Sequence, residues 1–302
     1  MEMRLYEIHH FIKHVPVPER PAKIDGLVQA GARYFATDYS SFEAHFTTRF
    51  MKICESKLYR RMLGRMPGVA DNLCTVIEAD KGCRLDTRHG NHLSTRSGVK
   101  VKIGGRRMSG DMCTSLGNGF TNLMLWSFMA DLGGCRWEGY VEGDDGIFAV
   151  YEGTPPTMEL AKRLGWTLDI QEHDNPATAS FCGCLCVDGQ VVRDPVSVLT
   201  SLGWSMTMPL AGIHLRKKLL RAKVLSLAYE LPQCPILGAI ARRGIALTEG
   251  VDPRFVEDGY HVRPKQGAIP DYAPSIAVRQ LFERQYGVSS AFQKQIEERI
   301  LT

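Results

Sequence analysis

The sequence of 302 residues lacks any apolar run of about 20 residues, the length that a helix needs to cross a bilayer. Its first ten residues mix charges of both signs and contain no apolar segment of the kind that directs secretion. Repeats and low-complexity stretches are also absent. We therefore expect a cytoplasmic protein without a transmembrane segment, long enough to form one globular unit with two subdomains.

A disulfide framework is also missing, because the nine cysteines are an odd number spread over a long chain. Three of them, Cys182, Cys184 and Cys186, alternate with other residues, and such a cluster of thiols could bind zinc. On an extended strand this spacing points the three thiols the same way, and no partner pair follows at ligand spacing. We interpret most of the nine cysteines as buried small apolar residues, with a metal site at these three as the alternative.

Positive charge is clustered rather than large in total. The formal net charge is +4, yet eight Lys or Arg residues lie between Lys81 and Arg107 against a single acid, Asp86. A second basic cluster falls on a predicted helix and consists of Arg216, Lys217, Lys218, Arg221 and Lys223. Such clusters bind phosphate backbones. A solvated charged face is the alternative for either cluster.

Apolar periodicity predicts the order of the main elements. A strand over residues 32–38 precedes an amphipathic helix from Phe42 to about Leu63, and a second helix runs from Met112 to about Leu132. Three later elements are predicted in turn: a hairpin around Asp144-Asp145, a helix over Thr157–Leu164, and a hairpin over Ser180–Val192 that turns at Asp188-Gly189. From about residue 205 the pattern is helical.

The chemically distinctive feature is a pair of adjacent carboxylates, Asp144 and Asp145, between two glycines at a predicted hairpin tip. Like charges side by side repel, so a bound cation is expected there. Hard divalent cations take oxygen ligands and promote phosphoryl chemistry. Asp38, which ends a strand, is positioned to complete such a site. A polar turn is the alternative interpretation of the tripeptide alone.

The second helix adds polar residues in a pattern. Thr114 and Asn118 are four residues apart and share one helix face, and Ser109-Gly110 precedes them. Two glycines in this helix, Gly117 and Gly119, each cost roughly 1 kcal/mol relative to alanine, which a close approach by another backbone or a nucleotide would explain. The alternative is that Thr114 and Asn118 simply face solvent.

These segments resemble motifs A, B and C of viral RNA-dependent RNA polymerases, in the right order. The residues are Asp38 to Glu43, Ser109 to Asn118, and Gly143 to Asp145, and their wording is similar to that of tombusvirus-like and nodavirus-like enzymes. Phe181 to Gly183 resembles motif E. The resemblance implies an α+β palm with a central antiparallel sheet packed on helices over residues 1–200, a partial fingers insertion at about 64–108, and a helical thumb over 201–302.

Carried over position by position, the resemblance implies a catalytic centre for template-directed RNA synthesis from nucleoside triphosphates. The expected ligands of Mg²⁺ or Mn²⁺ are Asp38, Asp144 and Asp145. The nucleotide is expected to contact Ser109, Gly110, Thr114, Asn118 and Glu43. RNA is expected to contact Arg106, Arg107, Cys182, Lys217 and Lys218. Asn118 would help to recognise the ribose 2′-hydroxyl.

Two departures from the family pattern limit this prediction. Glu43 stands where the family often has Asp, and it either reaches the ribose network or completes a capping box with Ser40. The basic motif F, expected before Phe11, and most of the fingers are missing from the sequence. The usual motif D lysine has no firm counterpart, and Lys162 is the candidate.

Three functions therefore compete. The leading one is an RNA-dependent RNA polymerase in the host cytoplasm, including membrane-associated replication sites. The alternative is a polymerase fragment or subunit that binds RNA but is inactive without fingers, for which a separate fingers-bearing chain or other viral replication proteins are the expected partners. A reverse transcriptase is disfavoured because Gly143 precedes the paired acids and Asn118 favours ribonucleotides.

Overall fold

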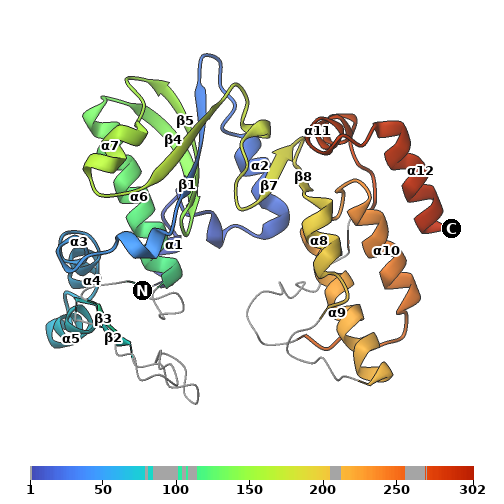
Figure 1. Cartoon of the computed structure of the whole chain (residues 1–302), viewed down its shortest axis with the longest axis horizontal. Helices are drawn as coiled ribbons and strands as arrows, with labels where there is room; N and C mark the ends of the chain where they lie inside the picture. Colours follow the sequence, from blue (N-terminus) through green and yellow to red (C-terminus); the bar gives the residue numbers. More distant parts are fainter. Residues whose placement is uncertain are drawn as a thin grey trace. The chain divides into compact units, whose positions relative to one another are not determined.

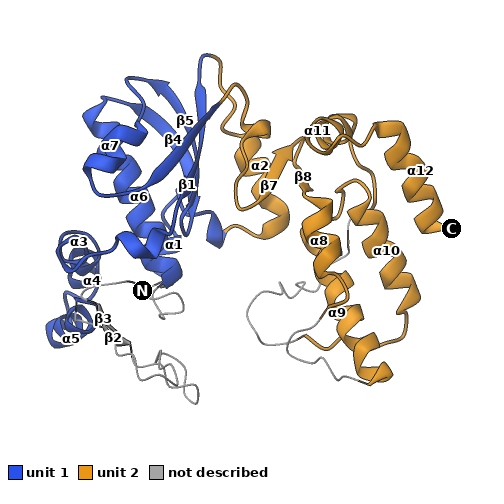
Figure 2. Cartoon of the chain, in the orientation of Figure 1, with its two compact units in different colours: residues 1–14, 31–172 blue, residues 15–30, 173–302 orange. Residues whose placement is uncertain are grey.

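The computed structural model describes residues 2–78, 81–83, 101–103, 107, 114–204, 212–255, 269 and 271–302. Two compact units are present (Figure 2). Unit 1 comprises residues 1–14 and 31–172, and unit 2 comprises residues 15–30 and 173–302. The chain is a mixed helix and sheet protein with an antiparallel sheet, as expected from the sequence. The predicted bounds of the palm, the fingers insertion and the thumb stay predictions.

Unit 1 is built on a four-stranded sheet of order β4-β5-β1-β6. Its strands are β1 (Arg33–Tyr39), β4 (Arg136–Glu142), β5 (Asp145–Glu152) and β6 (Leu168–His173). Its helices are α1 (Glu2–Tyr6), α3 (Thr48–Ile53), α4 (Glu55–Met62), α5 (Pro67–Glu78), α6 (Thr114–Leu132) and α7 (Met158–Arg163), with 3-10 turns η1 (Ile12–His14) and η3 (Phe42–His45). Two short strands, β2 (Lys81–Cys83) and β3 (Val101–Ile103), pair antiparallel.

Helix α6 covers one face of this sheet (Figure 1). It is apolar almost all round, and the Trp126 ring stacks on Phe148 of β5 with centroids 3.8 Å apart. Both rings are fully buried, in a core that also holds Phe11, Phe35 and Tyr59. Burying the large aromatics on both sides of the contact fixes α6 against the middle of the sheet. The polar residues of α6 are therefore held at fixed positions relative to β5.

The predicted helix from Phe42 to Leu63 is wrong as a single helix. The chain forms η3, then α3 and α4, with breaks at Phe46 and Cys54. Phe46 is extended, and Thr47 starts a new helix by accepting a hydrogen bond from the Phe50 N–H at 3.1 Å. The regularly spaced phenylalanines of this segment do not line one helix face; they cluster around Trp166, whose ring centroid lies 4.8 Å from that of Phe42.

The other predicted elements of unit 1 are confirmed. Strand β1 covers the expected strand, α6 covers the described part of the second helix, and β4 and β5 form the hairpin. Helix α7 begins after the cap residue Thr157, whose side chain accepts from the Leu160 N–H. Each of these segments carries its signal in a short stretch of sequence, either in apolar periodicity or in turn residues.

Unit 2 combines a small hairpin with a helical layer. Its elements are α2 (Arg20–Asp25), the 3-10 turns η2 (Val17–Glu19) and η4 (Pro176–Thr178), strands β7 (Cys184–Val187) and β8 (Gln190–Arg193), and helices α8 (Pro195–Ser201), α9 (Ile213–Glu230), α10 (Leu237–Leu247), α11 (Ile276–Tyr286) and α12 (Ser290–Leu301). The hairpin turns at Asp188-Gly189 as predicted, with both residues at positive φ. Leu185 and Val192 of the hairpin join the buried core of the helices.

No helix among the residues that the structure describes is both long enough and apolar enough to span a membrane.

Candidate active site

The hairpin tip of β4 and β5 presents the paired acids. The strands are in register up to Glu142 opposite Asp145, so Gly143 and Asp144 form a two-residue loop. Gly143 has a φ of +61°, a conformation that glycine adopts without steric cost. Asp144 and Asp145 are half-buried. The sequence prediction of a hairpin with these carboxylates at its tip is confirmed.

Asp38 lies next to this tip because of how β1 pairs with β5. The antiparallel register places Thr37 opposite Gly146, so Asp38 follows directly beside the start of β5. Thr37 and Tyr39 are buried and Asp38 between them is exposed, as strand alternation requires. The predicted neighbourhood of Asp38 and the paired acids is confirmed.

Glu43 joins the same cluster. A left-handed residue, Ser41 with φ 55°, turns the chain after β1, and no side chain caps η3. The capping-box interpretation of Glu43 is therefore wrong. Its carboxylate instead accepts a hydrogen bond from Asn118 Nδ2 at 3.2 Å. Asn118 is 3% exposed, so the alternative that it faces solvent is also wrong.

The carboxylates repel one another electrostatically. Burial raises the pKa of Asp144 above its ordinary value, a hydrogen bond from its own backbone N–H lowers it in part, and the negative charges of Glu43 and Asp38 raise it further. A bound cation would relieve this repulsion. As placed, no group of three or more His, Cys, Asp or Glu side chains among the described residues is arranged to hold a metal ion. The cluster thus offers oxygen donors without a closed cage.

The glycines of α6 are explained by close approaches. A Cβ on Gly119 would lie 3.0 Å from the Phe11 ring and 3.6 Å from the Gly143 backbone nitrogen. A Cβ on Gly117 would lie 2.7 Å from Glu55 Oε2. A close approach is present at both glycines, but side chains make it and not the backbone or nucleotide that was expected, because the Gly143 nitrogen is at an ordinary contact distance.

Asn122, for which the sequence patterns gave no prediction, is the polar residue closest to the hairpin loop. It is fully buried, one turn after Asn118 on α6. Its Nδ2 lies 3.2, 3.0 and 3.0 Å from the carbonyl oxygens of Gly143, Asp144 and Asp145. The only available signal was an amide four residues from Asn118 in an otherwise apolar helix.

Arg107 has a structural position that differs from its predicted contact with RNA. Its side chain is buried and forms an ion pair with Glu55, with exposures of 1% and 0%. The guanidinium also lies over the Phe46 ring, 4.8 Å from its centroid. Because the charge is already engaged by Glu55, this placement does not favour direct RNA binding.

The structure describes only some of the remaining predicted site residues. Thr114 is half-buried at the start of α6, on the same face as Asn118. Ser109, Gly110 and Arg106 lie outside the described residues. Lys162 is exposed on α7.

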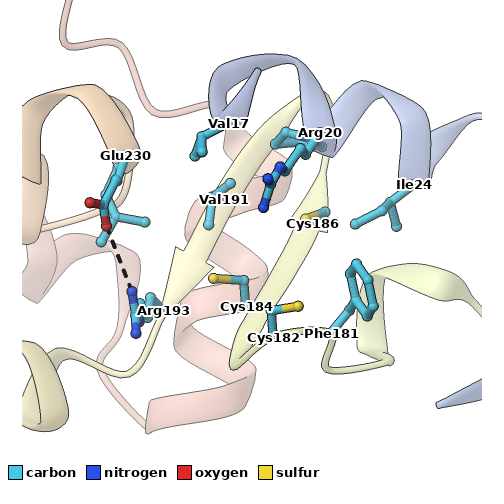
Figure 3. Close-up of a pocket in the computed structure, with 12 residues that line it drawn as sticks. Val17, Arg20, Ile24, Phe181, Cys182, Cys184, Cys186, Val191, Arg193 and Glu230 are labelled. Atoms are coloured by element: carbon cyan, nitrogen blue, oxygen red, sulfur yellow. Dashed lines mark ion pairs between the residues drawn. The ribbon is translucent and has the colours of Figure 1, made fainter. Parts of the chain in front are cut away.

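Unit 2 carries the other predicted RNA contacts. Lys217 and Lys218 are exposed on α9. Cys182 lies in a tight turn with Gly183, both at positive φ, and lines a cavity of about 180 Å³. Figure 3 shows the three cysteines around this cavity with Arg20 and with Arg193, which lies 3.8 Å from Glu230. Burial raises the pKa of the Cys186 thiol, consistent with a neutral apolar residue.

Comparison with known proteins identifies the class to which this sheet and its acidic tip belong. The family model for viral RNA-dependent RNA polymerase matches residues 16–203, more than half of the chain. The chain belongs to the viral RNA-dependent RNA polymerase family. The family implies an RNA-directed RNA polymerase with RNA and nucleotides as substrates. No curated protein matches the chain at a significant level.

Proposed function

We propose that unit 1 catalyses template-directed RNA synthesis by nucleotidyl transfer at the cluster of Asp38, Glu43, Asp144 and Asp145. The observation that carries the proposal is the convergence of acids from β1, η3 and the hairpin tip; burial raises the pKa of Asp144, and the charges of Glu43 and Asp38 add to this rise. Carboxylates that destabilise one another in this way are typical of sites that bind a cation.

Mg²⁺ or Mn²⁺ suits the donor chemistry of this cluster, because carboxylate oxygens are ligands that these hard cations prefer. When bound, a pair of such ions activates an attacking hydroxyl and stabilises a leaving phosphate. Asp38 and Asp144 would hold the ions, with Asp145 as a weaker or water-mediated ligand. A protonated Asp144 is a poor ligand, so catalysis requires this residue in its ionised form.

Asn118 and Glu43 would select the ribose. The Nδ2 of Asn118 donates to Glu43, while its buried Oδ1 has no hydrogen-bond partner in the part of the chain that the structure describes. Such an unpaired acceptor suits the hydroxyl donor that distinguishes a ribonucleotide from a deoxyribonucleotide. Thr114, with Ser109 and Gly110 preceding it, would contact the same nucleotide.

The wider assignments remain part of the proposal. The proposed palm covers residues 1–200 with a partial fingers insertion at about 64–108, the proposed helical thumb covers residues 201–302, and the motifs resemble those of tombusvirus-like and nodavirus-like enzymes. Exposed Lys217 and Lys218 would bind the RNA backbone through its phosphates. The proposed location is the host cytoplasm, at membrane-associated replication sites.

Primer extension tests the site directly. The substitution Asp144→Asn preserves side-chain shape and removes the charge, so incorporation of nucleoside monophosphates should fall to background. A matched control is Asp131→Asn, which makes the same chemical change at an exposed position near the end of α6. Undiminished incorporation by Asp144→Asn would refute the assignment of this residue.

The alternative is a chain that binds RNA and stays inactive without fingers. The unmodified chain distinguishes the two: RNA binding without any extension supports the alternative, and templated extension excludes it. Comparing NTP with dNTP incorporation then checks the role proposed for Asn118.

A further inference from the structure

The backbone of the hairpin loop is held by a single side chain. Two amide hydrogens of Asn122 face three consecutive carbonyl oxygens, those of Gly143, Asp144 and Asp145, at 3.0 to 3.2 Å. Three acceptors can only face a donor, so the nitrogen of the amide must point toward the loop. In a two-residue hairpin the carbonyls of the loop residues, here Gly143 and Asp144, have no partner in the strand ladder, which leaves Asn122 to satisfy them.

Fixing these carbonyls fixes the direction of the acidic side chains. The φ and ψ of a residue are set by the orientations of the peptide planes before and after it. The carbonyls of Gly143 and Asp144 belong to the planes on either side of Asp144, and those of Asp144 and Asp145 flank Asp145. Orienting all three therefore determines where both Cα–Cβ bonds point.

The setting of Asn122 makes this restraint rigid. The side chain is completely buried on α6, and α6 is held against β5 by the stack of Trp126 on Phe148. Gly119, one turn earlier, packs closely against the buried Phe11 ring, which a Cβ there would approach to 3.0 Å. A buried donor on a fixed helix allows the loop little freedom to rotate its peptide planes.

We propose that Asn122 is a positioning residue that orients Asp144 and Asp145 toward the carboxylates of Asp38 and Glu43. Its consequence for catalysis rests on the function proposed above, whereas its effect on the hairpin does not. Asn122 touches neither nucleotide nor RNA in this proposal and acts only through the loop backbone.

Hydrogen exchange on the metal-free full-length chain tests the positioning without any activity. In Asn122→Ala, amides of residues 144–146 should exchange on the order of tenfold faster or more, because the loop carbonyls lose their donor and the tip opens locally. The control is Thr121→Val, the neighbouring buried residue, whose hydroxyl faces Cys54 instead of the hairpin. It should leave exchange at the tip unchanged.

An isosteric variant covers the case in which Asn122→Ala fails to fold. In Asn122→Asp the introduced carboxyl can donate to the loop only while it is protonated, so exchange at 144–146 should accelerate as pH rises. The carboxyl groups of Asp38, Glu43, Asp144 and Asp145 lie nearby, so each pH is compared with the unmodified chain after correction for intrinsic exchange rates. A purely structural role would instead speed exchange throughout unit 1 as pH rises, without a selective effect at residues 144–146.

Activity then links the positioning to the proposed reaction. Misaligned carboxylates should lower kcat at least tenfold in Asn122→Ala with little change in the KM for nucleoside triphosphates, because the nucleotide contacts are elsewhere. Unchanged tip exchange in both Asn122 variants overturns the inference, as does full kcat with a loosened tip. If the unmodified chain incorporates nothing while tip exchange responds as expected, the proposed function fails and the positioning stands.

Discussion

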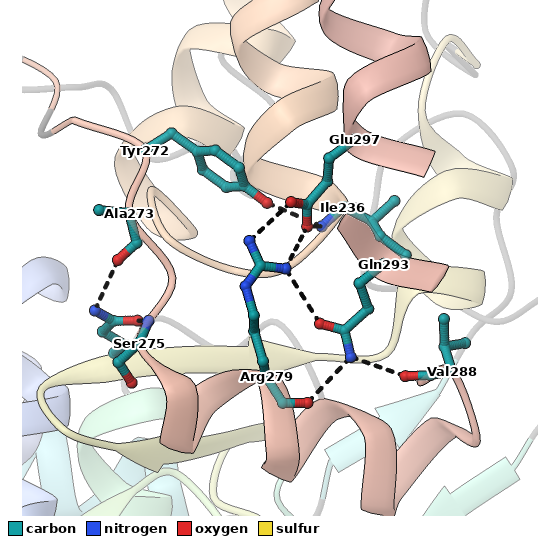
Figure 4. Close-up of polar contacts among 9 residues, drawn as sticks. Ile236, Tyr272, Ala273, Ser275, Arg279, Val288, Gln293 and Glu297 are labelled. Atoms are coloured by element: carbon teal, nitrogen blue, oxygen red, sulfur yellow. Dashed lines mark hydrogen bonds and ion pairs between the residues drawn. The ribbon is translucent and has the colours of Figure 1, made fainter. Parts of the chain in front are cut away.

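Removing one carboxylate from unit 2 should loosen its helical layer while leaving unit 1 intact. Glu297 of α12 accepts two hydrogen bonds from Arg279 of α11, at 3.0 and 2.8 Å, and one from the Ile236 N–H at 3.0 Å (Figure 4). The Arg279 and Glu297 side chains are 11% and 7% exposed. Glu297 thus connects α12 both to α11 and to the start of α10.

The Glu297 carboxylate also stabilises an unusual backbone conformation at Ile236. Its φ of +66° is unusual for a β-branched residue and persists only where neighbours hold it. The N–H of Ile236 is held by Glu297 and by the Tyr272 hydroxyl at 3.2 Å. Losing Glu297 removes the stronger of these acceptors together with the partner of a buried guanidinium.

The expected cost follows from that unpaired guanidinium. Removing one member of a buried ion pair costs about 3–5 kcal/mol, and the slight exposure here places Glu297→Ala near the lower end, at about 3 kcal/mol. Since 1.4 kcal/mol is a factor of ten, amides of α10 and α12 should exchange roughly 100-fold faster. Amides of α6 in unit 1 should exchange as before.

A double-mutant cycle isolates the ion pair. Arg279→Leu combined with Glu297→Leu should be less destabilised than the sum of the two single changes, by about 2 kcal/mol, because the apolar pair leaves no buried charge. Strict additivity, or equal acceleration in α6, would show that the pair does not act as described.

The pH dependence of the same network has a defined sign. Burial raises the pKa of Glu297, but hydrogen bonds from Arg279, Tyr272 and Ile236 outweigh it, so the folded pKa lies below the ordinary 4.5. The stabilisation is therefore complete above about pH 4.5 and is lost as pH falls through the lower folded pKa. In Glu297→Gln this acid-dependent loss should disappear, as followed by exchange in α12.

Three further predictions concern the other charged groups. Arg107→Met should destabilise unit 1 by about 3 kcal/mol, because it leaves the buried Glu55 without its ion-pair partner. Combining Arg107→Met with Glu55→Met should largely recover the melting temperature. A loss of RNA affinity without a loss of stability would contradict this interpretation. The folded pKa of Asp144 is raised, so the metal-free chain should lose stability as pH rises from 3.8 through that pKa. The variant Asp144→Asn should lack this loss. Mn²⁺ should raise the melting temperature of the unmodified chain more than that of the variant. Replacing Lys217 and Lys218 by Glu should weaken RNA binding for all sequences and flatten the dependence of log affinity on log salt by about 1 to 2; an unchanged slope would place the RNA elsewhere.

Local patterns were enough to predict much of unit 1. The hairpin with its paired acids needs only two strand-like runs and a glycine-containing loop, and it is present over β4 and β5. Helix α6 and the cap at Thr157 likewise depend on residues within a few positions of one another. The convergence of Asp38 with Asp144 was predictable through the family resemblance, which supplied the order of the strands that spacing alone does not give.

Contacts between distant segments decided the rest. The regular spacing of phenylalanines after Asp38 is compatible either with one helix or with a cluster around Trp166. Trp166 lies about 120 positions later in the sequence, and only its packing against these rings selected the cluster. Glu43 could cap its own helix or meet Asn118, and the left-handed turn at Ser41 settled the choice. The charge of Arg107 fits RNA as well as Glu55 until burial assigns it.

The sequence by itself therefore determined which residues form the acidic tip, because strands, turns and helix caps are specified within a few neighbouring residues. Only the tertiary structure decided what holds that tip. Asn122 and the carbonyls of Gly143 to Asp145 are about 20 residues apart, and a backbone carbonyl leaves no trace in the identity of its residue. The contact exists because α6 and β5 pack together, and packing is a property of the whole fold.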